Sequence, residues 1–319
     1  MKKPISKIFL KLFLAFIFCL GFGEILAQGC SSAGFCTMGA LKADQKFGIG
    51  KKIKLNYVEI SQLIAFSGLG ETINAATLDI SVAIGAKNQL QIRLPYAWVN
   101  GPLANTKAFG DVYLNYSRNL IKTEKYSLNA MIGTKFPRFT TALARADGLP
   151  LPFFYSPSLG TYDLVLGVSV ISKKWLLGIG FQNPIYKAVT DNGFTPLAYE
   201  NTPLYEQAKR YDSSVNIQRG ADIMLRLERN FRFSKYSFYV GLMPVWRLNP
   251  DEITDKDAKR VQVKGSDGLA AKALLGGRYN LDIHSSIKIL TGVNILQRKA
   301  NPDGLMKTSL FSLMYEWQF

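Results

Sequence analysis

Hydrophobic and polar residues alternate with a period of two along most of the chain after residue 44. From Gln89 to Leu94 every even position is apolar, whereas from Asp222 to Glu228 the apolar residues take the odd positions. This alternation is typical of β-strands that have one apolar and one polar face. It predicts twelve strands, at residues 45–59, 72–85, 89–99, 108–120, 125–136, 160–171, 174–183, 217–232, 235–248, 268–281, 285–297 and 305–319.

The connections between these segments alternate in length. Short turns are expected at 86–88, 121–124, 172–173, 233–234 and 282–284. Longer loops, which hold most of the prolines, are expected at 60–71, 100–107, 137–159, 184–216, 249–267 and 298–304. Bacterial outer-membrane barrels have short periplasmic turns and long extracellular loops. An even number of strands then places both chain termini at the periplasmic end.

The two faces of the strands favour a barrel in a membrane. Several strands carry bulky apolar residues on one face and Gly, Ser, Asn or charged residues on the other, and aromatic residues such as Trp175 and Trp317 lie near strand ends. This pattern suits a wet interior, a lipid-facing exterior and interfacial aromatic girdles. We therefore expect an all-β fold, a transmembrane antiparallel β-barrel of about twelve strands in the cell outer membrane. A soluble β-sandwich with core aromatics is the alternative.

The N-terminus has the pattern of a secretory signal peptide. Four lysines precede an apolar run from Leu12 to Phe22, and Ala27 is a small residue suited to cleavage. A basic region followed by a short apolar run and a small residue is typical of such signals. The expected organisation is a signal peptide at 1–27, a cysteine-bearing segment at 28–44 and an outer-membrane barrel at 45–319. A membrane anchor is the alternative, but the apolar run is short for one.

Cys30 and Cys36 remain after removal of the signal peptide. Export leads to an oxidising compartment where nearby cysteines pair, and the five residues between these two include two glycine or alanine positions and two serines. A Cys30–Cys36 disulfide is therefore expected. Two alternatives remain: a lipoprotein acylated at Cys30, which the preceding residues fit poorly, and a metal site, which would need more ligands.

Composition narrows the chemistry. The 319 residues hold 39 Lys and Arg against 23 Asp and Glu, a formal charge of +16, with one His and three Cys. These counts exclude a site with two imidazoles and a zinc site with four thiolates. No phosphate-binding glycine loop or nucleic-acid motif is present, so the basic excess favours lipopolysaccharide, anionic solutes or lumen electrostatics. We expect no metal, no cofactor and no nucleic-acid partner.

Alternation also predicts which charged residues face the lumen. Nine cations and six anions fall on inward positions, which would attract anions weakly. The alternative is that they pair across a narrow interior and fill it. The candidates for contact with solute are Lys52, Lys54, Arg93, Asp111, Asp163, Arg226, Lys272, Arg278 and Lys288, and the remaining inward charges are Lys135, Arg247, Asp79, Asp222, Glu228 and Glu316.

The two longest loops are rich in aromatic residues. They are expected either to fold into the mouth as an apolar vestibule for a hydrophobic solute, or to pack on each other. The residues concerned are Phe139, Phe153, Phe154, Tyr155, Phe194, Tyr199, Tyr205 and Tyr211.

Two resemblances add to this interpretation. The terminal strand, which ends in Tyr315-Glu316-Trp317-Gln318-Phe319, resembles the signal read by the outer-membrane barrel assembly machinery. Over about 250 residues, the order of Leu94-Pro95-Tyr96, Phe109-Gly110-Asp111, Thr134-Lys135-Phe136-Pro137 and Gly160-Thr161-Tyr162-Asp163 resembles the outer-membrane family named after the meta-pathway of phenol degradation. That resemblance implies a barrel of the twelve-stranded type and passage of small organic molecules. The cysteine-bearing segment and the long 184–216 loop depart from the family pattern.

The expected function is an outer-membrane channel or transporter for small organic solutes, either hydrophobic and aromatic or anionic. A structural or surface-binding barrel without transport is the alternative, and an outer-membrane hydrolase is a further one. Barrel hydrolases generally use a histidine near the outer rim. The sole histidine, His284, falls on a predicted periplasmic turn, so no enzyme activity is expected. The expected partners are outer-membrane lipid, lipopolysaccharide, the assembly machinery and a small solute.

Overall fold

The computed structural model describes residues 41, 47, 52–137, 142–186, 189–305 and 308–319. Cys30, Cys36 and the predicted signal peptide lie outside these residues. The wall of the molecule is built from β1 (Ile53–Phe66), β2 (Thr72–Ile84), β3 (Asn88–Asn100), β4 (Asn105–Phe109), β5 (Val112–Lys122), β6 (Tyr126–Phe136), β7 (Tyr162–Ser172), β8 (Trp175–Tyr186), β9 (Asp222–Arg232), β10 (Tyr236–Arg247), β13 (Gly268–Asn280), β14 (Ser285–Leu296) and β15 (Ser309–Gln318).

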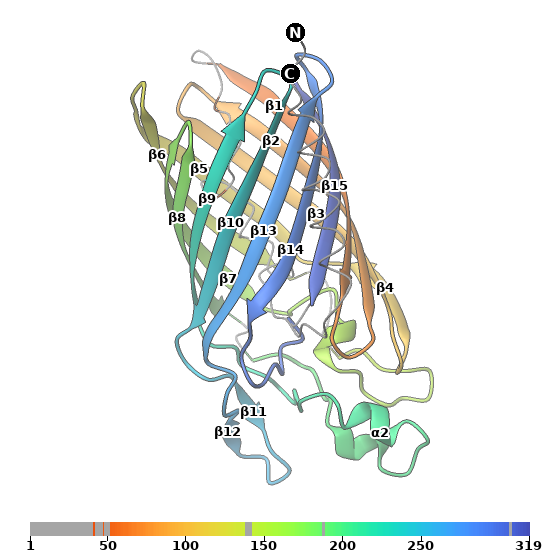
Figure 1. The fold of residues 1–319 in the computed structure, drawn as a ribbon. Helices are drawn as coiled ribbons and strands as arrows, with labels where there is room; N and C mark the ends of the chain where they lie inside the picture. Colours follow the sequence, from red (N-terminus) through yellow and green to blue (C-terminus); the bar gives the residue numbers. More distant parts are fainter. Residues whose placement is uncertain (1–40, 42–46, 48–51, 138–141, 187–188, 306–307) are drawn as a thin grey trace.

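These segments form one closed antiparallel barrel (Figure 1). The wall strands pair in the order of the sequence, with β4 and β5 sharing one place in that order, and β1 closes the ring by pairing with β15 as well as with β2. β4 and β5 both pair with β3 and act as one strand that is interrupted at Gly110 and Asp111. The barrel therefore has twelve strands, as the alternation predicts.

Turns and loops separate cleanly to the two ends of the barrel. The start of β1 and the C-terminus lie at the short-turn end, and the long loops lie at the other end with β11 (Glu252–Thr254), β12 (Arg260–Gln262) and α2 (Tyr205–Ala208) (Figure 1). Two short 3-10 helices, η3 (Phe153–Tyr155) and η4 (Pro196–Tyr199), also belong to the loop end. No helix among the described residues has the length and apolar character to cross a membrane.

The first strand is the largest departure from the prediction. β1 runs from Ile53 to Phe66, whereas strand 45–59 and a loop from residue 60 were expected. A bulge between Leu55 and Tyr57 shifts the alternation by one residue, and Ile60 to Phe66 then pair with both β2 and β15. An insertion of one residue changes which face the later side chains of the strand occupy, so a single period-two pattern does not fit the whole of β1.

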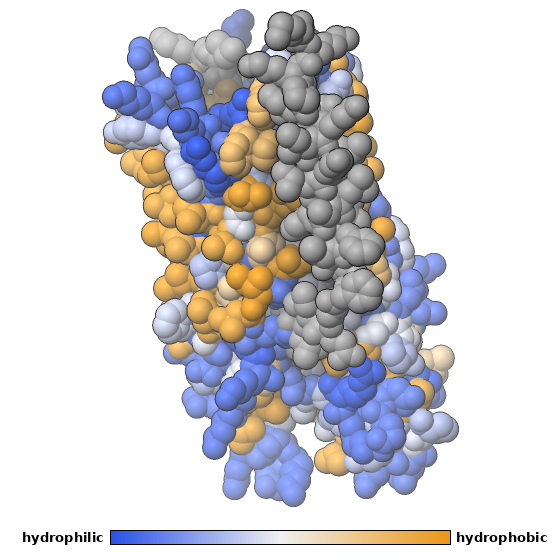
Figure 2. Space-filling view, viewed as in Figure 1, coloured by the Kyte–Doolittle hydropathy of each residue, from blue (hydrophilic) through white to orange (hydrophobic). Residues whose placement is uncertain are grey.

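The outer surface of the barrel is apolar in its middle and polar at both ends (Figure 2). Ile132, Ile179 and Leu242 are each about half exposed on this surface, at 52%, 55% and 46%. Inward positions on the same strands are buried and mostly polar, for example Asn129 and Gln182. Apolar side chains outside and polar ones inside are the arrangement of a barrel in a lipid bilayer, and this protein is located in the outer membrane.

Aromatic residues border the apolar band at both ends. Exposed aromatic residues mark the periplasmic border at Tyr126, Trp175, Tyr236, Tyr279 and Trp317, and the loop end at Phe66, Phe109, Phe136, Tyr186 and Trp246. Such residues favour the interface between hydrocarbon and water. The two girdles therefore give the depth of the barrel in the membrane, with the long loops outside the cell.

Candidate functional site in the barrel lumen

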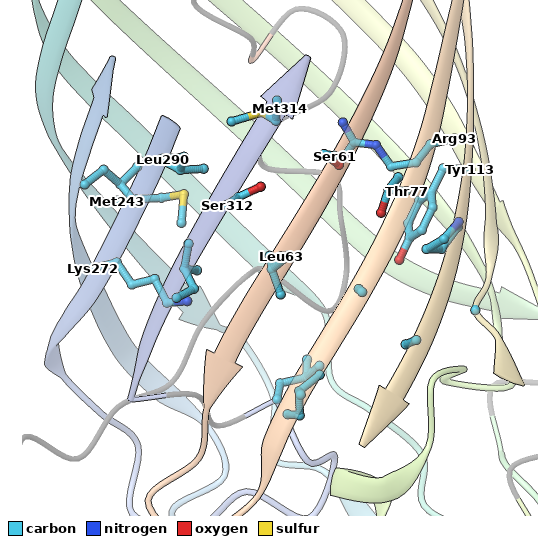
Figure 3. A pocket seen from close by; sticks show the side chains of 18 of the residues that line it. Ser61, Leu63, Thr77, Arg93, Tyr113, Met243, Lys272, Leu290, Ser312 and Met314 are labelled. Carbon is cyan, nitrogen blue, oxygen red and sulfur yellow. The ribbon is translucent and has the colours of Figure 1, made fainter. Parts of the chain in front are cut away.

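The lumen holds a cavity of about 230 Å³. Its wall comes from the inward faces of β1 to β3, β9, β10 and β13 to β15, and the 153–159 and 303–305 segments close it toward the loop end. In Figure 3 the side chains of Ser61, Thr77, Arg93, Lys272 and Met243 lie around this space on opposite walls.

One side of the cavity is apolar. Near the extracellular ends of β1 to β3, β14 and β15 the inward residues are aliphatic, because Leu63, Ile73, Val99, Leu290 and Leu310 occupy the lumen positions there. The end of the cavity is closed by apolar loop residues, namely Phe153, Phe154, Leu159 and Leu305. Lys272 on β13 and Arg226 on β9 line the same cavity, so apolar and cationic groups surround one space.

The periplasmic half of the cavity is held by ion pairs. Arg93 lies 2.8 Å from Asp79, and Gln91 donates to both oxygens of that carboxylate. On the strands next to β2, Lys288 lies 2.9 Å from Glu59, which is the register partner of Asp79. Glu316 accepts from Lys288 and from Arg278, the latter at 3.1 Å. These pairs link β2 to β3 and join β1, β13, β14 and β15 across the closing seam of the barrel.

Asp111 anchors a loop at the break between β4 and β5. Its carboxylate accepts from the Ser158 hydroxyl and from the backbone N–H of Leu159, and the ammonium group of Lys135 lies 3.0 Å away. Asp163 is 3.4 Å from the same ammonium group. The loop segment that caps the cavity is thus fastened to the barrel wall by a buried carboxylate.

A second buried network lies beneath the extracellular loops. Arg247, at the end of β10, contacts Asp222 at 2.9 Å, Asp251 at 2.7 Å and Asp303 at 2.8 Å. Asp303 is also 3.2 Å from Arg219. The third arginine, Arg298, lies 3.5 Å from Asp222 and 4.0 Å from Asp303. The network joins strands β9 and β10 to three loops, and all its members are buried.

Two loop carboxylates of this network have pKa values shifted in opposite directions. Burial raises the pKa of Asp251 to about 6, with the Asp303 carboxylate acting in the same direction and Arg247 opposing it. Burial acts on Asp303 as well, but Arg247, Arg219 and Arg298 together hold the pKa of its carboxyl below the usual range. Asp303 is therefore the charged centre of the network, and Asp251 is the group whose pKa is raised to about 6.

The charge balance of the lumen differs from the expected excess of cations. Lys52 and Lys54 lie exposed at the periplasmic rim, and Asp163 is buried outside the cavity lining. The structure adds charged residues to the interior that the alternation did not place there, namely Arg219, Arg298, Glu59, Glu71, Asp251 and Asp303. The described interior holds nine cations, namely Arg93, Lys135, Arg219, Arg226, Arg247, Lys272, Arg278, Lys288 and Arg298. It holds ten anions, namely Glu59, Glu71, Asp79, Asp111, Asp163, Asp222, Glu228, Asp251, Asp303 and Glu316, so the described cations are not in excess.

Six candidates for solute contact line the cavity together: Arg93, Asp111, Arg226, Lys272, Arg278 and Lys288. Glu59 was missed although it falls within the predicted strand 45–59, because that prediction placed even positions such as Lys54 inside and the bulge between Leu55 and Tyr57 turns the odd positions inward instead. Arg219, Arg298 and Asp303 carry no such signal, because they belong to loops. Their placement depends on tertiary contacts alone.

Leu41 also lies inside the lumen. It is fully buried against Met131, Val165 and Met224, although it belongs to the predicted segment 28–44 before the barrel. Gly178 makes this possible, because a Cβ atom there would lie 2.8 Å from the Leu41 side chain. A glycine on the inner wall thus provides the space that an apolar residue from outside the barrel strands fills.

The aromatic loops pack on each other. Phe154, Phe194 and Tyr211 form edge-on ring contacts with centroids 5.5 to 6.1 Å apart, and Tyr155 and Tyr199 are buried beside them. Glu71 accepts from Tyr211 and Ser67 within this cluster. Burial raises the pKa of Tyr155 and of Tyr199 to about 12. Phe153 and Phe154 also line the cavity, so the loop aromatics form its lid. Phe139 lies outside the described residues.

The described residues contain no cluster of His, Cys, Asp and Glu suited to a metal ion. His284 lies exposed in the turn before β14, where its ring stacks on Trp317 and its Nδ1 atom is 3.0 Å from the Gln318 carbonyl oxygen. This is the periplasmic end of the barrel, far from the outer rim at which barrel hydrolases would use a histidine.

Comparison with known proteins supports the architecture. No protein-family description matches the sequence, and no curated protein matches it. Among solved structures, the COG4313 outer membrane channel from Pseudomonas putida F1 is similar with a TM-score of 0.57 at 14% identity, over 86% of this chain and 97% of that one. The NanC porin covers 83% of this chain and all of its own, at 10% identity and a TM-score of 0.47. The CymD monoaromatic hydrocarbon channel matches over 94% of this chain and 95% of its own length, at 9% identity and a TM-score of 0.43.

Sequence identities this low support a shared fold and nothing more, and the two TM-scores below 0.5 support no further conclusion. The resemblance to the phenol meta-pathway family stays an expectation. What is established is the architecture and its location: the chain is a closed, twelve-stranded antiparallel β-barrel of the outer membrane.

Proposed function

We propose that this barrel is a channel or transporter for small organic solutes that combine a hydrophobic or aromatic body with an anionic group. The observation that carries the proposal is the lumen cavity, in which Leu63, Val99 and Leu310 face the same space as Lys272 and Arg226. Ligand sites are usually concave and mainly apolar, with a few polar groups that set orientation. The cavity has that composition.

Lys272 is the residue best placed to select for an anion. Its side chain is 2% exposed and points into the cavity from β13 (Figure 3). A hydrogen bond between a buried ammonium group and a carboxylate is stronger than one between neutral groups. The apolar wall opposite would contact the hydrocarbon part of the solute.

Uptake by cells tests the proposal. Cells with the intact gene, cells without it and cells carrying Lys272→Gln would be compared for uptake of benzoate, of its neutral analogue benzyl alcohol and of a fatty acid. We expect the variant to take up benzoate at least about tenfold more slowly, because one charge-assisted hydrogen bond is lost. Uptake of benzyl alcohol should stay at the wild-type level.

Lys209→Gln is the matched control, because Lys209 is an exposed loop lysine that pairs with Glu206 at 2.7 Å. It should transport all three solutes as the wild type does. Equal uptake of every solute with and without the gene would contradict transport. The alternative of a surface-binding barrel would then be favoured if deletion of residues 252–262 removed binding to a partner cell or surface.

The C-terminal strand supports the proposed partnership with the barrel assembly machinery. β15 pairs along its length with β1, and the backbone N–H of Phe319 donates to the Asn56 carbonyl oxygen at 3.1 Å. The strand that would carry the assembly signal is therefore also the strand that closes the barrel. Contact of the loop end with lipopolysaccharide is proposed as well.

A further inference from the structure

The two ends of the barrel carry very different charge. At the periplasmic rim, cations occupy the strand ends and turns, whereas Glu124 and Asp282 are the exposed carboxylate side chains in the described part of that rim. The extracellular loops mix both signs, as in the 249–267 loop. The exposed or half-exposed cations of the periplasmic rim are Lys52, Lys54, Lys87, Arg118, Lys122, Lys125, Lys173, Lys174, Arg229, Arg232 and Lys235.

One member of this rim lies on the lipid-facing surface and is held in place by aromatic rings. Arg229 on β9 is directly opposite Trp175 on β8, and its guanidinium carbon lies 4.9 Å from the centre of the Trp175 ring. It is also 5.5 Å from the centre of the Phe231 ring. Stacking of this kind orients a guanidinium group and leaves its N–H donors at the edge of the plane. Within the described chain, no carboxylate pairs with Arg229.

The rings around Arg229 continue as a layer on the outer face of β8 to β10. Phe231 stacks on Phe238 with centroids 4.6 Å apart, and Phe233 stacks on Tyr236 at the same distance. Trp175 and Phe233 are each about half exposed. Lys173 and Lys174 in the turn before β8 and Lys235 in the turn before β10 are exposed beside this layer.

The level of this surface in the membrane indicates which kind of ligand it would meet. Arg229 lies in the periplasmic aromatic girdle, where the hydrocarbon of the inner leaflet meets its headgroups. Phosphate groups are located at that depth, and arginine matches their geometry with two parallel donors. Basic residues near an anionic membrane surface attract it. The apolar outer face of β8 and β9, with Leu177 and Leu227, lies next to the rings and would contact an acyl chain.

We propose that the periplasmic ends of β8, β9 and β10 bind an anionic phospholipid of the inner leaflet, with its phosphate on Arg229 and Lys174 and its acyl chain along the aromatic layer. This site lies outside the barrel. It depends on the location in the outer membrane and not on transport, so either proposal can fail without the other.

The test measures which lipid stays on the purified full-length barrel. The protein in mixed micelles with equal phosphatidylglycerol and phosphatidylcholine is transferred to detergent alone, and the retained lipid is counted by native mass spectrometry. We expect wild-type protein to retain phosphatidylglycerol about tenfold more than phosphatidylcholine. Arg229→Gln with Lys174→Gln should abolish this preference, and Arg229→Lys should weaken it, because the ammonium keeps the charge but loses the stacked plane.

The matched control is Arg118→Gln with Lys122→Gln, which removes two cations from the same rim on β5, away from the aromatic layer of β8 to β10. It should keep the preference within about twofold. An equal loss in both double variants would mean a diffuse basic rim and would overturn the site. Wild-type protein without preference, or a double variant at Arg229 and Lys174 that keeps it, would also overturn the site.

A second measurement does not depend on the arginine variants. Phosphatidylglycerol with brominated acyl chains should quench tryptophan fluorescence more than brominated phosphatidylcholine does at equal concentration. Trp175→Phe should remove that difference, whereas Trp246→Phe, at the extracellular girdle, should keep it. A difference that persists in Trp175→Phe would place the lipid elsewhere and overturn the proposal.

Discussion

The Nη2 atom of Arg247 lies 2.8 Å from a carboxylate oxygen of Asp303, and both side chains are fully buried. Arg247 is the last residue of β10, whereas Asp303 belongs to the loop between β14 and β15. Asp303 also contacts Arg219 from the loop before β9. A single carboxylate thus holds together segments that are far apart in the sequence and that close the lumen toward the cell exterior.

Asp303→Asn should loosen this closure. The variant leaves Arg247 and Arg219 without the charge they share, and breaking a buried pair costs about 3 kcal/mol or more. We expect a lower unfolding free energy and, in planar bilayers, more frequent or larger openings than in the wild type. Asp147→Asn is the control, because Asp147 pairs with Arg145 at an exposed site and its replacement should leave the unfolding free energy nearly unchanged. Wild-type conductance in Asp303→Asn would mean that this loop does not limit the opening.

Gly304→Ala tests the same closure by size. Gly304 has φ of +64°, and a Cβ atom there would lie 2.5 Å from backbone atoms of Phe153 and Phe154. The added methyl group must push the 153–155 segment away, so we expect a loss of about 2–4 kcal/mol and larger openings. Gly148→Ala separates the effect of backbone strain from that of the contact. Gly148 has φ of +85°, but a Cβ atom there would have no neighbouring atom within 4 Å. This variant should cost about 1–2 kcal/mol and leave conductance unchanged. Equal effects of both variants would exclude a role for the contact.

The barrel and its inward charges were predictable because lipid and lumen impose opposite preferences on alternate residues. Residues such as Arg226, Lys272 and Lys288 fall on inward positions of regular strands, and the structure places each of them on the cavity wall. The bulge beside Leu55 was not predictable, because no residue type in β1 marks the position of the extra residue. That residue nevertheless reverses the facing of the side chains that follow it.

The loop contacts that close the lumen could not be predicted from the alternation of hydrophobic and polar residues. Asp251, Asp303 and Arg219 belong to loops without periodicity, so nothing in their sequence neighbours indicates that they meet Arg247. For the loop aromatics, the sequence allowed either an apolar vestibule or mutual packing. Their packing around Glu71, Ser67 and Tyr211 depends on contacts between loops that are distant in the sequence, so the sequence could not decide between the two. The expected excess of lumen cations failed for the same reason, since loops supply carboxylates that a count over strands omits.

Cys30 and Cys36 provide a prediction that the sequence alone supports. Two thiols in an exported segment should oxidise to each other, so thiol labelling of the denatured, unreduced protein should find neither free. Replacement of both by serine should leave the barrel folded, because its stability depends on closed strand pairing. Mass spectrometry of the same sample should give Gln28 as the first residue. A mature start at an acylated Cys30 would instead identify a lipoprotein.

Trypsin added to intact cells tests the orientation in the membrane. Lys256, Lys259 and Arg260 are exposed in the β11–β12 hairpin at the loop end, whereas Lys173 and Lys174 are exposed at the opposite end. Cleavage should occur in the hairpin and should spare the turn at Lys173 until the outer membrane is permeabilised. The aromatic loops should be cleaved more slowly than the hairpin, because their aromatic residues are buried. Cleavage at Lys173 in intact cells would mean an inverted barrel.

Asp251 gives the extracellular network a pH dependence. Burial raises its pKa to about 6, whereas an aspartate in an unfolded chain titrates near pH 4. Between these values the folded protein holds a proton that the unfolded chain has released. The contribution of this residue to stability is therefore largest at low pH and declines as the pH rises through the folded pKa.

Asp251→Asn removes this titration and keeps an oxygen that accepts from the Gly220 N–H, which is 2.9 Å from the wild-type carboxylate. From about pH 4 to about pH 8, the unfolding free energy of the wild type should fall relative to the variant by about 3 kcal/mol. Urea unfolding in detergent at several pH values measures the difference. Asp257→Asn, at an exposed site in the β11–β12 hairpin that follows Asp251, should follow the wild type. A difference that grows in the opposite direction would mean that Arg247 outweighs burial and holds Asp251 ionised.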